Sequence, residues 1–393
     1  MASNTSWTSW TSWTSWTSWT SWMAGGPAAT PNVLQTDGMV RSREALLDQP
    51  FAGAVRAPNT YPTETRFAQR TWHLGKTADA NALPSPAVTW LHRMGDFARA
   101  QVYLCELFDG LAFARDPAGV WSRVDHKLGP IAVIARPPSA KVMHAQCERV
   151  ESWAGLRNER ASEIVSQVDP PFGYWASVAG LSPTSTRFTL ELITLAMQFA
   201  ALVVQRMKFD LVVPRPADFS GRIQPMVDTP AFFAYPSGHA TQSYAVAAVL
   251  MRLLVRHGAQ RPVEAMAQIA RLAERISTNR VVAGLHYPVD NMAGLALGLS
   301  IGEYLATRGD GVGWQPRTMA PLGPGEADHD FAPKLDPNPA RSRTAYIASP
   351  VLTIRDDHVT DTDEVRTWSG SSPALSWLWQ RARAEWHEAD IFA

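Results

Sequence analysis

Apolar residues recur with the period of an α-helix along most of this chain, and no other sequence feature constrains the fold as strongly. Two segments, 189–207 and 291–306, are apolar almost throughout and are interpreted as buried core helices. Alternating runs typical of strands are nearly absent before residues 344–357. The sequence therefore predicts an all-α helical bundle. Its expected helices are 86–114, 140–168, 187–208, 239–257, 262–279 and 290–307.

Neither apolar segment is expected to cross a membrane. The first is interrupted by Glu191, Gln198 and Arg206, and the second has 16 residues and contains Glu303. A membrane-spanning helix needs about 20 predominantly apolar residues. The first residues also lack the basic and apolar regions of a signal peptide. We expect a protein that is cytoplasmic or otherwise soluble, with no transmembrane span.

The two ends of the chain differ in composition from its middle. Residues 5–22 are six copies of Thr-Ser-Trp, a period that suits neither a helix nor a strand. Residues 1–40 are therefore predicted to be a disordered low-complexity segment and linker, and the start codon is left open between Met1 and Met23. Residues 41–309 are predicted to be one catalytic domain, and 310–393 an irregular extension. The extension ends in an amphipathic helix that packs its apolar side chains, Trp377, Leu378 and Trp386, onto the body.

Composition excludes several classes of partner and site. Lysine plus arginine number 36, as do aspartate plus glutamate, so the net charge is zero. This balance argues against a nucleic-acid partner. Cys105 and Cys147 match no zinc-ligand spacing and form no disulfide framework, so they are interpreted as small buried side chains. The composition makes no prediction of oligomeric state.

Three polar motifs interrupt the apolar pattern between residues 208 and 290. The first, KFDLVVPRP, places Lys208 at a helix end and Arg215 seven residues later. The second, AYPSGHAT, places Ser237, Gly238 and His239 at a helix start, where unpaired backbone N–H groups bind anions.

The third motif, TNRVVAGLHYPVD, contains Arg280, His286 and Asp290. A histidine four residues before a carboxylate can donate its Nδ1–H to it, which leaves Nε2 as a lone pair. Together the motifs supply three cations, helix N–H donors and two histidines, which suits an oxyanion in phosphoryl transfer. We expect one histidine to attack and the other to protonate the leaving oxygen.

This pattern resembles the type 2 phosphatidic acid phosphatase (PAP2) and vanadium haloperoxidase superfamily, over a motif core of residues 185–307. All ten fixed residues are present in the family order. They are Lys208, Arg215, Pro216, Pro236, Ser237, Gly238, His239, Arg280, His286 and Asp290. The chain departs from the pattern at Asn279, where many members have serine, and this concerns one minor contact to an oxygen.

The resemblance implies a role for each motif residue. His286 is the phosphohistidine nucleophile or the apical vanadate ligand, and Asp290 orients it. The oxyanion is held by Lys208, Arg215, Ser237, Gly238, His239 and Arg280. The expected function is hydrolysis of a small phosphomonoester without a metal or cofactor, because GLHYPVDNMAG is similar to the phosphatase branch.

The alternative function is a vanadium haloperoxidase that oxidises halide with peroxide. Phe232, five residues before Ser237, would line a halide or substrate pocket and stands where the resemblance places a phenylalanine in chloride-type peroxidases. A non-enzymatic helical scaffold would not require all ten fixed residues. The sequence does not identify the substrate or the halide.

Overall fold

The computed structural model describes residues 87–254, 263–322, 335–336, 353–354, 359–361 and 365–388. The predicted N-terminal segment, residues 1–40, lies outside this part of the chain. The chain divides into two compact units. The described residues of one unit contain only the 3₁₀ helix η2, Val88–Arg93. All other elements below belong to the second unit.

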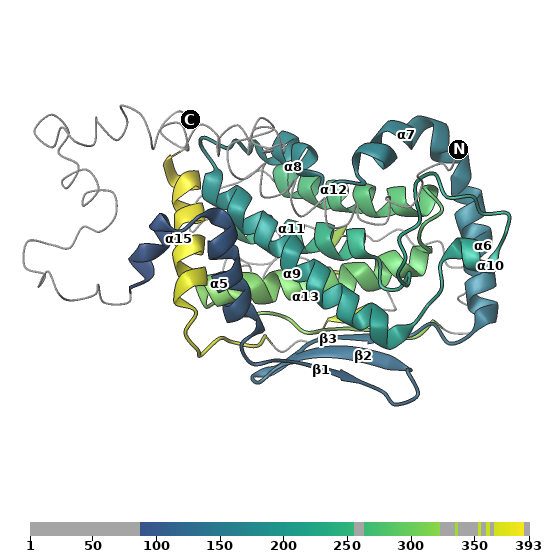
Figure 1. Ribbon diagram of the computed structural model, residues 1–393, viewed down its shortest axis with the longest axis horizontal. Helices are drawn as coiled ribbons and strands as arrows, with labels where there is room; N and C mark the ends of the chain where they lie inside the picture. Colours follow the sequence, from purple (N-terminus) through teal and green to yellow (C-terminus); the bar gives the residue numbers. More distant parts are fainter. Residues whose placement is uncertain are drawn as a thin grey trace, which may run out of the picture. The chain divides into compact units, whose positions relative to one another are not determined.

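The second unit is mainly helical, as the apolar periodicity predicts (Figure 1). Helices α9, α11, α12 and α13 lie side by side, and α11 contacts each of the other three. The helices are α5 Asp96–Phe108, α6 Ala140–Trp153, η3 Ala154–Leu156, α7 Arg157–Ser166, α8 Phe172–Ala179, α9 Arg187–Leu211, α10 Pro216–Phe219, α11 Gly238–Leu254, α12 Val263–Val282, α13 Pro288–Asp310 and α15 Pro373–Glu388.

A five-stranded sheet covers one side of these helices, in the order β1-β2-β3-β4-β7. Strand β3 pairs with β4 in parallel, and the other neighbours are antiparallel. Strand β2 contacts α9, and β3 and β4 contact α13. The strands are β1 Leu111–Arg115, β2 Trp121–His126, β3 Gly129–Ala135, β4 Arg317–Met319 and β7 Val359–Asp361; a separate pair is formed by β5 Leu335–Asp336 and β6 Thr353–Ile354.

The sheet corrects the expectation that strands are nearly absent before residue 344. The predicted helix 86–114 ends at Phe108, because the chain turns at Gly110 with a positive φ of 77° and continues as β1. Turns at residues 116–119 and 127–128 then reverse the direction of the chain twice. Alternate residues of β2 are buried, which is the pattern of a strand with one face on a core. The residues that form these turns can be recognised in the sequence, but each strand is too short to show a clear alternation of apolar and polar residues.

Other helix predictions differ in detail. The range 140–168 contains two α-helices joined by η3, and α8 and α10 were not predicted. The predicted C-terminal helix is α15, in which Trp377 and Leu378 are buried and the Trp386 Nε1–H donates to Thr189 Oγ1 at 2.9 Å. Of the strand expected at 344–357, the described residues contain β6.

One cysteine was interpreted wrongly. Cys147 is buried on α6, as expected, but Cys105 is exposed on α5. The periodic pattern around Cys105 directs Leu104 and Leu107 into the core, so the residue between them faces outward.

In the part of the chain that the structure describes, one helical stretch is long and apolar enough to span a membrane: α9 with its continuation to Phe219. However, 78% of its apolar window is buried inside the protein. Its Glu191 is also buried and accepts hydrogen bonds from Arg99 Nε and Nη2, both at 2.6 Å. Helix α9 is therefore buried as a core helix is.

Candidate active site

Glycines of α13 let this helix approach α11 closely and bring the second and third motifs together. A Cβ atom at Gly294 of α13 would lie 2.6 Å from Ala240 Cβ, and one at Gly298 would lie 2.5 Å from Thr241 O. Side chains at these positions would push α13 away from α11. The close approach lets Ser237 N–H donate to the backbone oxygen of Asp290 at 2.9 Å. The start of α11 is therefore fixed against the start of α13.

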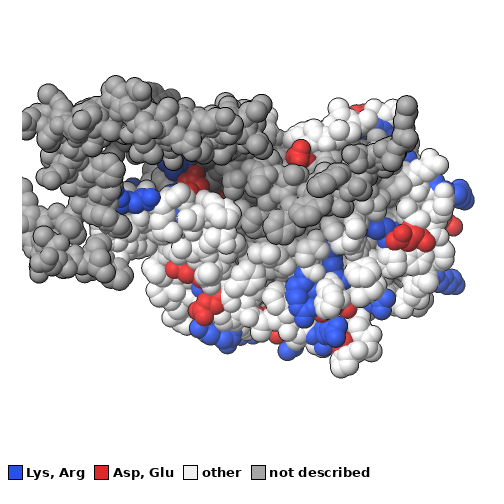
Figure 2. All heavy atoms as spheres, in the orientation of Figure 1, with Lys and Arg blue, Asp and Glu red and all other residues white. Residues whose placement is uncertain are grey.

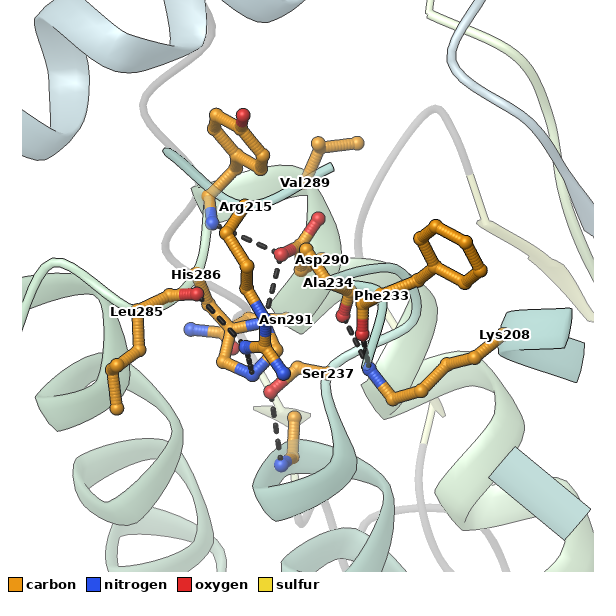
Figure 3. Close-up of polar contacts among 12 residues, drawn as sticks. Lys208, Arg215, Phe233, Ala234, Ser237, Leu285, His286, Val289, Asp290 and Asn291 are labelled. Atoms are coloured by element: carbon orange, nitrogen blue, oxygen red, sulfur yellow. Dashed lines mark hydrogen bonds and ion pairs between the residues drawn. The ribbon is translucent and has the colours of Figure 1, made fainter. Parts of the chain in front are cut away.

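His286 and Asp290 form the pair that their spacing predicts (Figure 3). His286 Nδ1 lies 2.8 Å from Asp290 Oδ2, and both residues are buried. The same oxygen accepts the Tyr287 N–H at 3.1 Å. The carboxylate is thus held by the first turn of α13 and in turn holds the imidazole ring.

The contacts of His286 determine its tautomer. Its Nε2 lies 3.0 Å from Arg215 Nη1, and a guanidinium only donates hydrogen bonds. Nε2 must therefore carry the lone pair, and Nδ1–H donates to Asp290. Burial, followed by the charges of Arg215 and Lys208, lowers the pKa of His286 well below its ordinary value. The ring is neutral at ordinary pH and presents Nε2 as a nucleophile or ligand.

The two cations of the first motif are Lys208, in the last turn of α9, and Arg215, which immediately precedes α10 (Figure 3). Lys208 Nζ donates to the carbonyl oxygens of Phe233 and Ala234, at 2.7 and 2.5 Å, in the loop before α11. Arg215 donates from Nη1 to Leu285 O at 3.0 Å, but its buried Nη2 has no hydrogen-bond partner among the residues that the structure describes. Burial lowers the pKa of Arg215 to about 10, which leaves the group charged at neutral pH.

Arg280 approaches from the last turn of α12. Its Nη2 donates to Ile164 O at 3.0 Å and to Gln167 Oε1 at 3.2 Å. Its Nε and Nη1 are buried and have no partner among the described residues. Burial lowers the pKa of Arg280 to about 10, so it also remains a cation. Buried N–H groups of this kind are unfavourable unless an acceptor binds them.

The second motif begins α11 as predicted. Ser237 Oγ accepts the Ala240 N–H at 3.4 Å and so caps the helix. The first N–H groups of α11, from Gly238 onward, have no acceptor within the helix. His239 Nε2 lies 3.0 Å from Gln167 O; since a carbonyl only accepts, Nε2 carries the proton. Burial, and then Arg280, lowers the pKa of His239 to about 3.

The balance of charge in this cluster favours an anion. Lys208 and Arg215 interact with the buried carboxylate of Asp290, whereas no carboxylate is found to act on the buried Arg280 among the described residues. Burial raises the pKa of Asp290, and the nearby Lys208 opposes this effect. An anionic ligand would compensate the excess positive charge and accept the unpaired N–H donors. Among the described residues, no group of three or more His, Cys, Asp or Glu side chains is placed to hold a metal ion.

Phe232 lies against the cations of the first motif. Its ring centroid is 5.4 Å from Lys208 Nζ and 5.1 Å from Arg215 Cζ, and its carbonyl accepts the Arg215 Nε–H at 3.0 Å. The residue is 40% exposed, so it lies where the site meets solvent. On the face in Figure 2, basic and acidic side chains are interspersed, which agrees with the net charge of zero.

Sequence reasoning missed the contribution of α7. Asn279, where the sequence departs from the expected pattern, donates from Nδ2 to Glu163 Oε2 and Gln167 Oε1, both at 3.0 Å. Gln167 also contacts Arg280 and His239. No pattern marks Gln167 in the sequence, because its contacts are with residues about 70 to 110 positions later.

Residues 190–308, which contain all three motifs, match the model of the PAP2 superfamily. Over these residues the chain is similar to members of this superfamily. It is 34% identical over 85 residues to the decaprenylphosphoryl-5-phosphoribose phosphatase of Mycobacterium tuberculosis, in both the CDC 1551 / Oshkosh and the ATCC 25618 / H37Rv strains. The match covers 22% of this chain and 42% of that phosphatase, so it spans less than half of the relative's length.

Among solved structures, part of the chain matches that of the first bacterial vanadium-dependent iodoperoxidase. It has a TM-score of 0.33 and 20% identity, and the match covers 43% of this chain and 50% of that one.

Proposed function

We propose that this protein is a phosphatase that hydrolyses a small phosphomonoester through a phosphohistidine on His286. The observation that carries the proposal is the neutral His286 ring, whose Nε2 lone pair lies beside unpaired donors of Arg215. Phosphoryl transfer needs a nucleophile together with donors for the equatorial oxygens. The PAP2 match over residues 190–308 supports the same assignment.

In the first step, Nε2 of His286 attacks phosphorus and the bond to the ester oxygen breaks. Arg215 Nη1 must leave Nε2 and turn to a phosphate oxygen. The phosphorylated ring becomes cationic, and the Asp290 carboxylate stabilises it across the 2.8 Å contact. Lys208 and Arg280 neutralise the charge that spreads over the transferred group.

His239 would supply the proton that the leaving oxygen needs. Its Nε2–H is bonded to Gln167 O, so Nδ1 is the atom that takes up and gives the proton. The ring is neutral in the free site, since its pKa is about 3. A bound phosphoester raises that pKa, and the proton comes from the monoanionic ester or from solvent. In the second step, water loses a proton to Nδ1 and attacks phosphorus, which releases phosphate and restores His286.

The proposal is tested with p-nitrophenyl phosphate and with trapping of the phosphoenzyme after an alkaline quench. We expect the wild type to release phosphate, and His286→Ala to form neither phosphate nor phosphoenzyme. His144→Ala is the matched control, because His144 is exposed on α6. Release by His286→Ala within a few-fold of the wild type would contradict the nucleophile assignment.

The alternative, a vanadium haloperoxidase, uses the same residues. Vanadate is an oxyanion, and the unpaired N–H groups of Arg215 and Arg280 together with the Nε2 lone pair of His286 fit it. Bound vanadate would supply the activation of peroxide. An assay with vanadate, peroxide and bromide or chloride separates the two functions: halide oxidation without phosphate release would favour the peroxidase.

A further inference from the structure

Gln167 lies at the C-terminal end of α7 and is fully buried. Its backbone oxygen accepts from His239 Nε2 at 3.0 Å, and its side-chain Oε1 lies 3.2 Å from Arg280 Nη2. The residue therefore touches two members of the oxyanion site from a part of the chain that carries no motif.

The orientation of the Gln167 amide follows from its neighbours. Asn279 Nδ2 and Arg280 Nη2 both point to the same atom, at 3.0 and 3.2 Å. The guanidinium of Arg280 only donates, so the atom that faces it must be the amide oxygen. Nε2 is then the other end of the amide, and it is buried with no hydrogen-bond partner in the described part of the chain.

An unpaired amide N–H in the interior is unfavourable unless an acceptor arrives. Next to Gln167, Arg280 Nε and Nη1 are unpaired in the same way. Three buried donor atoms on two adjacent side chains thus lack an acceptor. A phosphate or vanadate ion provides several acceptor oxygens in one ligand.

We propose that Gln167 is a further ligand of the oxyanion: Nε2–H donates to one of its oxygens while Oε1 holds Arg280 in place. This inference rests on the oxyanion site of the proposed function. It adds a neutral donor, contributed by α7, to the charged groups of the three motifs. A neutral donor can bind an equatorial oxygen without adding to the repulsion among the cations.

Two variants separate the donor from the acceptor. Gln167→Glu keeps an acceptor for Asn279 and Arg280, but replaces the donor by a carboxylate. Gln167→Met removes both functions at similar length. The matched control is Gln198→Met, a buried glutamine on α9 that precedes Lys208 by ten residues, about 15 Å along the helix. Orthovanadate binding is measured by calorimetry at about pH 8, where a carboxyl beside Arg280 is ionised.

We expect Gln167→Met to weaken orthovanadate binding by about 10- to 100-fold, as loss of a hydrogen bond to a charged group does. Gln167→Glu should bind more weakly still, because its carboxylate repels the anion. Gln198→Met should bind as the wild type does. Melting temperatures report whether each variant is folded, and Gln167→Glu remains informative if Gln167→Met fails to fold.

Binding by Gln167→Glu within about twofold of the wild type would overturn the inference. Gln167 would then act only through its oxygen. A wild type that binds orthovanadate but releases no phosphate from esters would refute the proposed hydrolysis and leave this inference standing. A wild type that does not bind orthovanadate would refute both.

Discussion

Asp290 can be tested by a change that preserves shape and removes charge. In Asp290→Asn, the amide oxygen can still accept from both His286 Nδ1 and Tyr287 N, which now donate to Oδ2 at 2.8 and 3.1 Å. Arg215 continues to donate to His286 Nε2. The histidine tautomer should therefore survive, and the expected loss comes from the missing negative charge.

The magnitude follows from the 2.8 Å separation of Nδ1 and Oδ2. Opposite unit charges at this distance interact by about 6 kcal/mol at an effective dielectric constant of about 20. If roughly half of the charge has developed on the ring in the transition state, the loss is about 3 kcal/mol. Since about 1.4 kcal/mol corresponds to a factor of ten in rate, kcat should fall by roughly 100-fold.

The assay is steady-state hydrolysis of p-nitrophenyl phosphate, with the melting temperature as a test of folding. Asp290→Ala should lose more activity, because it also removes the acceptor that orients His286. The control is Asp125→Asn, which breaks a partly exposed ion pair with Arg123 on β2 and should leave kcat unchanged. A folded Asp290→Asn protein with kcat within tenfold of the wild type would show that the charge of Asp290 does not stabilise the transition state.

Three further outcomes follow from the described structure. Gly298→Ala should lower the melting temperature and kcat, because its Cβ would lie 2.5 Å from Thr241 O. Overpacking at this contact should destabilise the protein by about 1–3 kcal/mol, which exceeds the stabilisation expected from the higher helix propensity of alanine. Gly173→Ala is the control, because a Cβ atom at Gly173 would meet open space, and it should stabilise the protein by about 0.5–1 kcal/mol. Equal stabilisation by Gly298→Ala and Gly173→Ala would contradict the close packing of α13 against α11. The pKa of His239 is about 3 in the folded protein, so below about pH 6.5 the unfolded chain binds more protons at this residue than the folded protein does. The unfolding free energy of the wild type, relative to that of His239→Gln, should therefore fall by about 1.4 kcal/mol per pH unit from about 6.5 toward 3. Curves of unfolding free energy against pH that run parallel for the two proteins would refute this. Val212→Asn should raise the denaturant midpoint by an amount equivalent to about 1 kcal/mol, because φ is +49° at this β-branched residue, and a lower midpoint would count against strain there.

The helices of the core and the order of the three motifs were predictable from the sequence. The long α9 and α13 have apolar periods that extend over many residues, so their existence and type follow from local pattern. The His286–Asp290 contact was predictable for the same reason, because a separation of four residues places both on one side of a helix start. The five-stranded sheet was not predictable, since its strands have three to seven residues and gain stability mainly by pairing with each other.

The chemistry of the site was thus set by the residue types in three motifs, whereas its shape was decided by contacts between distant segments. Gln167 became part of the site only when α7 packed against α12, more than 100 residues later in the chain. The tautomer of His286 was fixed by Arg215, which immediately precedes α10. Local sequence determines which groups can donate or accept, but only the packed tertiary structure decides which buried groups have already found a partner and which are left for a ligand.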